Sequence, residues 1–373
     1  MAGFGWPPRI MDACEAPVEP EPQTLTRSAP PIAGYRKFDV DDHGTAVAGL
    51  IAARKTDFGG SGLAAPEVTI VPIHSGEPGL TRDLRDAVAQ YNVRVFNLSF
   101  AFRPNESFDE LHDVIAGANG RRKLLFVVSA PDDGKPVNVR VPIMYGTFPN
   151  VVGVAATVPN GQSLLPDNGG NMWGAQYVQI AAPGIGYGSL GRKGGYVPVG
   201  GTSFAAPLVA ATAALLVEQG LDDPTLVKNR LIATATVVPS YRDKIQGGLL
   251  NVQRAVTNLG ASVLVEQIGQ DARHDKVVNV TGNPTIQFMS SAKGSIPVLL
   301  RDILRLTLIG NRYRLVFNDR VNGSVRIVDD VEAIKKDQIT YRSVPTVRGG
   351  PPGSNVLDHL GSYADYFGPI NNN

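Results

Sequence analysis

A serine and a histidine stand at the start of two small-residue segments that lie far apart in the chain. Ser203 lies within Gly-Gly-Thr-Ser-Phe-Ala-Ala-Pro at 200–207, and His43 lies within Asp-Asp-His-Gly-Thr-Ala-Val-Ala-Gly at 41–49. A hydroxyl becomes a nucleophile when an imidazole near its own pKa accepts its proton and later returns that proton to the leaving group. The two segments therefore predict a serine nucleophile and a histidine base.

The residues around the pair fit this chemistry better than a structural role. Gly200 and Gly201 let the backbone approach a substrate, and the helix predicted after Ser203 directs its positive end toward developing negative charge. A serine alone would more often be a helix N-cap, and a histidine alone would more often be a core residue. The complete strings favour catalysis, since the small residues after His43 also let its helix lie close to the helix after Ser203.

Both strings resemble the signatures of the subtilisin-like serine peptidases, the subtilase family. The resemblance extends over about residues 9–258. The further segments that carry it are Gly62–Ile73, Phe148–Ala156, Trp173–Gly184 and Gly247–Val256. The resemblance implies a protein or peptide substrate and hydrolysis through an acyl-enzyme on Ser203.

The family also carries a catalytic aspartate at the end of its first core strand, about thirty residues before the histidine. Asp12, in Arg-Ile-Met-Asp-Ala-Cys at 9–14, is the only acid at that separation, although Ala-Cys replaces the usual Ser/Thr-Gly. The resemblance implies that Asp12 orients His43. Asp39, Asp41 and Asp42 lie too near His43 in the chain to reach its far nitrogen easily, and a solvated loop is expected there. A first strand that is incomplete in this sequence is the other alternative.

The residues expected around the reacting carbonyl depart from the family pattern. Where the family has Ala-Gly-Asn, this chain has Ala-Pro-Asp, which puts Asp132 in the place of the side-chain donor to the oxyanion, beside the N–H of Ser203. An ionised carboxylate there would repel the oxyanion, whereas a protonated one could donate a hydrogen bond. Asn138 is a substitute donor if the loop is rearranged, and an exposed turn is the structural alternative for Asp132.

The resemblance also implies where an extended substrate binds. The segment Asn97–Ala101 looks like the strand end that lines the pocket for the residue before the scissile bond. The family usually has glycine where Ala101 stands. The residues expected to contact substrate are Ser99, Phe100, Ala101, Ser129 and Ala130.

The elements that must position these residues are short apolar runs alternating with helical patterns. Uniformly apolar strands are expected where helices cover both faces of a parallel sheet. The predicted fold is a doubly wound α/β fold with a mostly parallel sheet. The predicted strands are Val68–Ile73, Val93–Leu98, Leu124–Ser129, Val151–Ala156 and Tyr177–Ile180. The predicted helices are 43–53, Arg82–Gln90, Leu111–Ala118 and the stretch from Ser203 to about Gly220.

The pattern changes near residue 259, where short alternating segments begin. Leu304–Ile309, Tyr313–Phe317 and Ser324–Val328 are separated by Gly-Asn at 310–311 and Asn-Gly at 322–323, which are hairpin signals. The sequence thus predicts a peptidase domain over 1–258 and a small β-rich domain with an irregular tail over 259–373. A regulatory protein partner that binds this second domain is one expectation.

Composition limits the other classes of function. The chain has 373 residues, is 43% apolar and carries a formal net charge of +1, so neither nucleic acid nor an anionic membrane is expected as its partner. The single cysteine excludes a disulfide within the chain, and no apolar run approaches the length of a membrane span. No dense acidic loop is present, so no metal is expected, and no cofactor is expected either. The first thirty residues lack a signal-peptide pattern, which predicts a cytoplasmic protein. The mature form of a secreted precursor is the alternative.

Two functional hypotheses follow. The first is an active serine endopeptidase. The second is a subtilase-like scaffold with little or no activity that binds extended peptide or a partner protein, motivated by the altered residues at Asp12 and Asp132. Retention of both Ser203 and His43 argues for the first, because a binding scaffold needs neither.

Overall fold

The computed structural model of the protein describes most of the chain in separate segments. These are residues 9–12, 42–54, 62–64, 68–73, 79–102, 109–121, 123–131, 140–165, 174, 177–221, 223–236, 238–241, 244–257, 263–267, 276–280, 285–299, 302–309, 312–319, 321, 324–332, 339–343, 354–357 and 363–367. They form two compact units, residues 1–228 with 236–252 and residues 229–235 with 253–373. No helix of these segments is long and apolar enough to cross a membrane.

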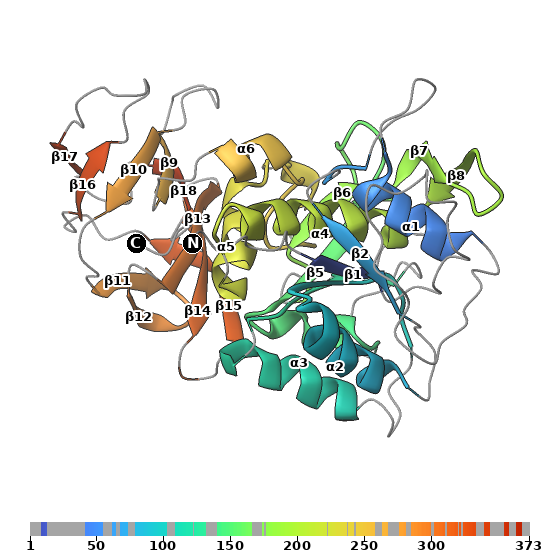
Figure 1. Ribbon diagram of the computed structural model, residues 1–373. Coiled ribbons are helices and arrows are strands. Elements are labelled where there is room, and N and C mark those ends of the chain that lie inside the picture. The colour runs from blue at the N-terminus through green and yellow to red at the C-terminus, as the bar shows by residue number, and fades with distance from the viewer. Residues whose placement is uncertain are drawn as a thin grey trace. The chain divides into compact units, whose positions relative to one another are not determined.

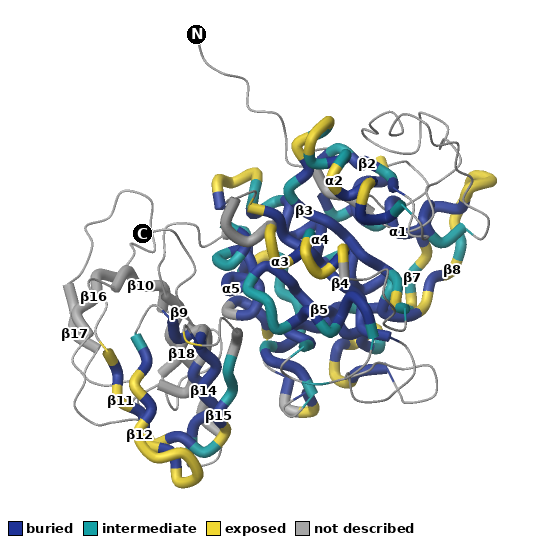
Figure 2. The backbone as a smooth tube through the Cα atoms, turned by 90° about the horizontal axis from the view of Figure 1, so that it is seen from below, coloured by how far each residue is buried: buried dark blue, intermediate teal, exposed yellow. Residues whose placement is uncertain are grey.

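The first unit is built on a six-stranded sheet in which every neighbouring pair is parallel. The strand order is β2-β1-β3-β4-β5-β6. Their bounds are β1 Arg9–Asp12, β2 Thr69–Pro72, β3 Val95–Leu98, β4 Leu125–Ser129, β5 Val151–Thr157 and β6 Ile180–Pro183. Because parallel strands point the same way, their carboxyl ends meet at one edge of the sheet. Figure 2 shows β3, β4 and β5 buried along their length, which explains their largely apolar sequences.

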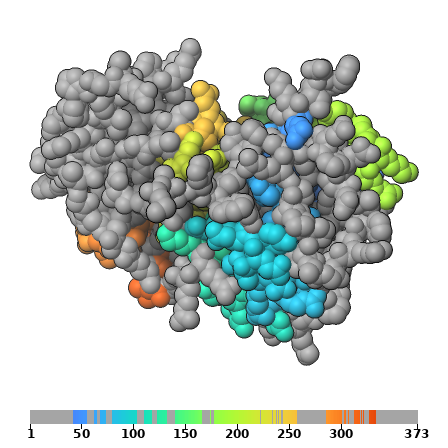
Figure 3. All heavy atoms as spheres, in the orientation of Figure 1, coloured from blue at the N-terminus to red at the C-terminus, as the bar shows by residue number. Residues whose placement is uncertain are grey.

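Helices cover both faces of this sheet. Figure 1 shows α2 (Leu80–Tyr91) and α3 (Asp109–Arg121) on one face, with α4 (Thr202–Glu218) on the other and α1 (His43–Ala52) beside it. Figure 3 shows α2 and α3 at the surface in cyan and blue-green. The arrangement confirms the predicted doubly wound α/β fold. Helix α4 is buried over most of its length, and its alanines allow the backbone to approach β3, β4 and β5 closely.

The structure differs from the predicted elements before α4. The strand expected at Tyr177–Ile180 begins only at Ile180, since the backbone N–H groups of Tyr177 and Val178 are already bonded in a turn to the carbonyl of Gly174, at 2.8 and 2.9 Å. A two-stranded antiparallel ribbon, β7 (Ile185–Leu190) with β8 (Tyr196–Gly200), was not predicted. Its first strand contains Gly186 and Gly188, which weaken the alternation that marks a strand.

Two further helices follow α4 in the chain, α5 (Pro224–Thr234) and α6 (Val252–Thr257), with the short 3₁₀ turn η3 (Pro239–Tyr241) between them. Another 3₁₀ turn, η2 (Ile143–Thr147), precedes β5. Lys228 of α5 is fully buried, and its Nζ donates to the carbonyls of Gly146 and Phe148, at 2.9 and 2.8 Å. The Gly146 carbonyl also accepts from Gln179 Nε2 at 3.0 Å. Burial away from water lowers the pKa of Lys228 from 10.5 to about 7.

This lysine should make the stability of the protein depend on pH. Between pH 7 and 10.5 the unfolded chain keeps the lysine protonated while the folded chain releases the proton, so the free energy of unfolding should rise with pH, by up to about 1.4 kcal/mol per pH unit. Urea unfolding at pH 7 to 10 measures this slope. Lys228→Met should flatten it, whereas Lys193→Met, which changes an exposed lysine, should not. Equal slopes in wild-type protein and Lys228→Met would contradict the assignment.

The second unit contains a ten-stranded sheet in which all neighbouring strands are antiparallel. Its strand order is β12-β11-β15-β14-β13-β18-β9-β10-β16-β17. The bounds are β9 Val263–Gln267, β10 Lys276–Val280, β11 Thr285–Ser290, β12 Gly294–Leu299, β13 Ile303–Ile309, β14 Arg312–Asp319, β15 Ser324–Glu332, β16 Ile339–Ser343, β17 Ser354–Leu357 and β18 Tyr363–Phe367. The antiparallel pairs β13–β14 and β14–β15 are those that the hairpin signals predicted.

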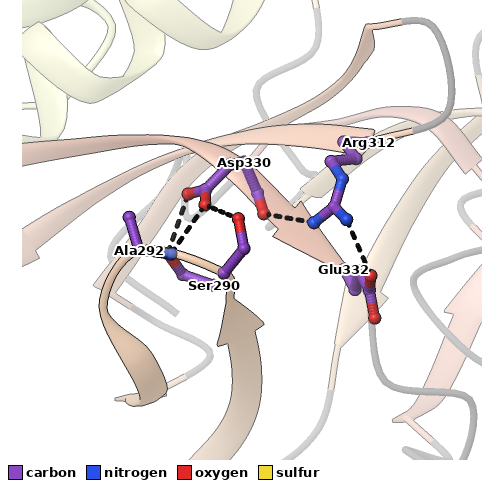
Figure 4. A network of polar contacts seen from close by, with 6 residues as sticks. Ser290, Ala292, Arg312, Asp330 and Glu332 are labelled. Atoms are coloured by element: carbon purple, nitrogen blue, oxygen red, sulfur yellow. Dashed lines mark hydrogen bonds and ion pairs between the residues drawn. The ribbon is translucent and has the colours of Figure 1, made fainter.

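Asp330 of β15 organises the turn between β11 and β12 (Figure 4). Its carboxylate accepts hydrogen bonds from the hydroxyls of Ser291 and Ser290, at 2.5 and 2.7 Å, and from the N–H of Ala292 at 3.0 Å. These donors, the Ser291 hydroxyl foremost, lower the pKa of Asp330 from 3.8 to about 2. The carboxylate thus supplies the acceptor that this exposed turn needs.

Candidate active site

Ser203 lies in the first turn of α4, at the carboxyl edge of the parallel sheet. The turn before the helix depends on Gly201, whose φ of 118° is a conformation that side chains rarely adopt. Hydrogen bonds fix the serine to the end of β3. The Ser99 hydroxyl donates to the Ser203 carbonyl at 2.8 Å, and the Ser203 hydroxyl lies 3.4 Å from the Ser99 carbonyl. The predicted nucleophile is therefore held at a helix N-terminus, where the helix dipole favours negative charge.

Two polar residues that the sequence reading did not single out hold this corner together. Asn97, buried within apolar β3, donates through Nδ2 to the Ser99 hydroxyl at 2.9 Å. The Thr202 hydroxyl donates to the carbonyl of Ala130, directly after β4. Asn97 could have been found as the single polar residue in the strand Val-Phe-Asn-Leu. The ends of β3 and β4 are thus both tied to the first turn of α4.

His43 is the first residue of α1 and lies beside the residue that follows the serine. Its ring centroid is 5.2 Å from that of Phe204, with the two planes tilted by 57°. Helices α1 and α4 pack against each other (Figure 1), and the small residues of α1 are buried. Ala46, Val47 and Phe204 belong to one apolar cluster. The structure thus places the predicted base and the predicted nucleophile at the adjoining N-termini of two packed helices.

Asp12 ends β1, a central strand that lies between β2 and β3. In the register of the sheet it stands opposite Asn97 of β3 and Pro72 of β2, so its backbone is at the same carboxyl edge as Ser99. Both α1 and α4 pack against β1. The predicted third member of the triad is therefore on the strand that both α1 and α4 contact.

The remaining predicted site residues divide between described and other parts of the chain. Ser99, Ser129 and Ala130 are buried at the ends of β3 and β4, whereas Ala101 is exposed. Phe100 is half-buried, and its ring centroid lies 5.0 Å from that of Phe102. Asp132, Asn138, Asp39 and Asp41 lie outside the described residues. Among the described residues, no group of three or more His, Cys, Asp and Glu side chains could hold a metal ion.

Tyr187 of β7 is a further residue near the site that the sequence did not reveal. Its hydroxyl lies 2.7 Å from the carbonyl of Pro183 and 3.0 Å from that of Phe204, so its one hydrogen is shared between these two acceptors. Burial raises the pKa of this phenol well above its usual range, so the hydroxyl keeps its proton. It therefore acts as a permanent hydrogen-bond donor to the first turn of α4.

The fold and this corner define the class of protein. Ser203 lies at the carboxyl edge of a parallel α/β sheet, and His43 begins the helix beside it. Serine peptidases of the subtilisin type combine these two residues on an α/β fold. The family model described as "Subtilase family" matches residues 26–268. Because that match covers well over half of the chain, the protein belongs to the subtilase family. The matched range begins after Asp12.

Individual proteases show the same likeness. The chain is 26% identical over 229 residues to the thermophilic serine proteinase of Bacillus sp. strain AK1, covering 60% of this chain and 54% of that protein. It is 30% identical over 225 residues to alkaline elastase YaB of Bacillus sp. strain YaB, covering 58% and 56%. The chain thus spans about half the length of these relatives.

A solved structure is similar over a comparable share of the chain. The patellamide maturation protease PatA is 26% identical with a TM-score of 0.54, and the match covers 67% of this chain and 96% of that structure. The likeness therefore extends from sequence to architecture.

Proposed function

We propose that the protein is an active serine endopeptidase that hydrolyses protein or peptide substrates. The observation that supports this most is the placement of Ser203 and His43 at the adjoining N-termini of α4 and α1, with Phe204 in contact with the His43 ring. Ser203 attacks the scissile carbonyl while His43 accepts its proton. His43 then gives that proton to the leaving amine, and a water repeats the sequence to release the acyl group.

Asp12 completes the proposed triad as the group that orients the imidazole. Its position at the end of β1, beside Asn97, supports this role. Its charge would stabilise the imidazolium that forms when His43 takes the proton. The three residues of the proposed triad would then come from three separate elements: Ser203 from α4, His43 from α1 and Asp12 from β1.

The oxyanion is proposed to be held by the Ser203 N–H at the start of α4 together with Asp132. The positive end of α4 supports the first donor. For Asp132 to donate it must be protonated, so activity should fall as rising pH ionises it. Asp132→Asn should remove this alkaline limb, whereas Asp132→Ala should lower kcat by about 10²–10³-fold, a size taken from subtilisin, a related protein. Identical pH profiles for wild-type protein and Asp132→Asn would rule the role out.

Reaction with a fluorophosphonate tests the function directly, since such reagents modify only a serine whose proton a base can remove. Stoichiometric labelling is expected, with mass spectrometry locating the adduct on Ser203. His43→Ala should abolish the labelling, and His112→Ala, which changes a half-exposed histidine of α3, should not. Folded wild-type protein that stays unlabelled would favour the peptide-binding scaffold instead. The regulatory role expected of residues 259–373 stays a prediction.

A further inference from the structure

The β7–β8 ribbon contacts both helices that carry the proposed catalytic pair. The Ser189 hydroxyl donates to the Ala46 carbonyl of α1 at 2.6 Å, and the Tyr187 hydroxyl donates to the Phe204 carbonyl of α4 at 3.0 Å. A side chain at Gly49 of α1 would lie 2.6 Å from the Ser189 hydroxyl, so ribbon and helix are in close contact there. Figure 3 shows the ribbon at the surface in yellow-green.

Asp42, the residue before His43, makes an unusual contact with this ribbon. An aspartate at a helix N-cap ordinarily accepts hydrogen bonds from the first turn of its own helix. Asp42 has the N-cap position of α1, but it is in the left-handed conformation, with φ of 70°, and makes no such side-chain bond. Its carboxylate instead accepts the backbone N–H of Arg192 at 2.6 Å, and Arg192 Nε lies 3.8 Å from the same oxygen.

The turn that receives Asp42 is itself closely defined. The Gly191 N–H donates to the Gly195 carbonyl at 3.1 Å, and the Gly194 N–H donates to the Gly191 carbonyl at 3.0 Å. Gly194 and Gly195 both have positive φ, at 82° and 77°. The Arg192 N–H therefore has a fixed direction, and a carboxylate bonded to it has one as well. A hydrogen bond with a charged acceptor is among the stronger ones.

We propose that Asp42 is a positioning residue for His43, acting through its bond to the Arg192 N–H. The proposal rests on the proposed peptidase function. His43 follows Asp42 directly, so fixing Asp42 against the ribbon fixes the direction in which the imidazole leaves the backbone. The same ribbon is bonded to α4 through Tyr187, so it sets the histidine relative to Ser203. A misplacement of about 1 Å in such a pair costs about 10²-fold in rate.

Three substitutions separate the bond from the backbone conformation. Asp42→Asn keeps an acceptor oxygen and tolerates the left-handed conformation, Asp42→Gly keeps only the conformation, and Asp42→Ala keeps neither. If the bond positions His43, Asp42→Asn should retain kcat within about threefold. Asp42→Gly and Asp42→Ala should lower kcat and the rate of fluorophosphonate labelling about tenfold with KM unchanged. Urea unfolding of each variant reports whether the fold is intact.

Each outcome bears on the proposal. Asp42→Gly with wild-type kcat and labelling rate would overturn it, since the backbone conformation alone would then suffice. A kcat lowered equally in all three variants would also overturn it, because the acceptor would not restore the rate. Native-state hydrogen exchange provides a readout without catalysis, and Asp42→Gly should speed exchange of the Arg192 amide about tenfold relative to Asp42→Asn. Wild-type protein that neither hydrolyses peptide nor reacts would refute the peptidase function itself, and the positioning role with it.

Discussion

Replacing Ser203 with alanine should lower kcat for peptide hydrolysis by about 10⁶-fold, a size taken from subtilisin, a member of the same family. His43→Ala should lower kcat about as much. Without the histidine nothing removes the proton of the serine hydroxyl, and without the serine there is no nucleophile for the histidine to activate. The double variant should lose hardly more than either single variant. This lack of additivity is the specific expectation for two residues that act as one unit across α1 and α4.

Steady-state hydrolysis of a fluorogenic peptide library measures these rates, with active-site titration correcting the wild-type enzyme concentration. Ser240→Ala and His112→Ala are matched controls, since they remove an exposed hydroxyl and a half-exposed imidazole elsewhere in the first unit. Both should leave kcat unchanged. Losses that multiply in the double variant would show that Ser203 and His43 act independently, which the proposed proton transfer forbids.

Replacing Asp12 with asparagine should lower kcat by about 10⁴-fold with KM little changed. The physical reason is that the amide offers the imidazole the wrong hydrogen-bond pattern and no negative charge when the imidazolium forms. The expected loss is smaller than for Ser203 because the base and the nucleophile both remain. Proton transfer should then depend on the tautomer that His43 adopts unaided.

Asp39→Asn and Asp41→Asn are the controls that give this experiment its discrimination, because they remove two of the three other acids close to His43 in the chain, the third being Asp42. Both should keep the wild-type kcat. A loss of about 10⁴-fold in either, with Asp12→Asn unaffected, would move the role of the third residue to that acid. The first core strand would then serve only to build the sheet.

The local strings around Ser203 and His43 were sufficient to predict the family. The glycines before the serine allow close approach of the backbone, and the small residues after the serine and the histidine allow their helices to pack closely. Both requirements can be read from a short stretch of sequence around each side chain. The uniformly apolar runs at β3, β4 and β5 likewise report burial on both faces, so these strands were predicted closely. For the strand at Ile180–Pro183 the sequence predicts a start at Tyr177, because Tyr177 and Val178 are apolar although their N–H groups are bonded in a turn to Gly174.

Contacts between distant residues were decided only by the tertiary structure. The sequence places Asp42 in a solvated loop, but folding brings the turn at Arg192 to its carboxylate. Likewise, nothing in the chain near Tyr187 indicates that its hydroxyl donates to the first turn of α4. Sequence pattern reports which residue types a helix or strand needs. Hydrogen bonds between separate elements, whether 150 positions apart as for Arg192 and Asp42 or 17 as for Tyr187 and Phe204, depend on how the fold arranges its connections. That arrangement determines which elements support the serine and the histidine.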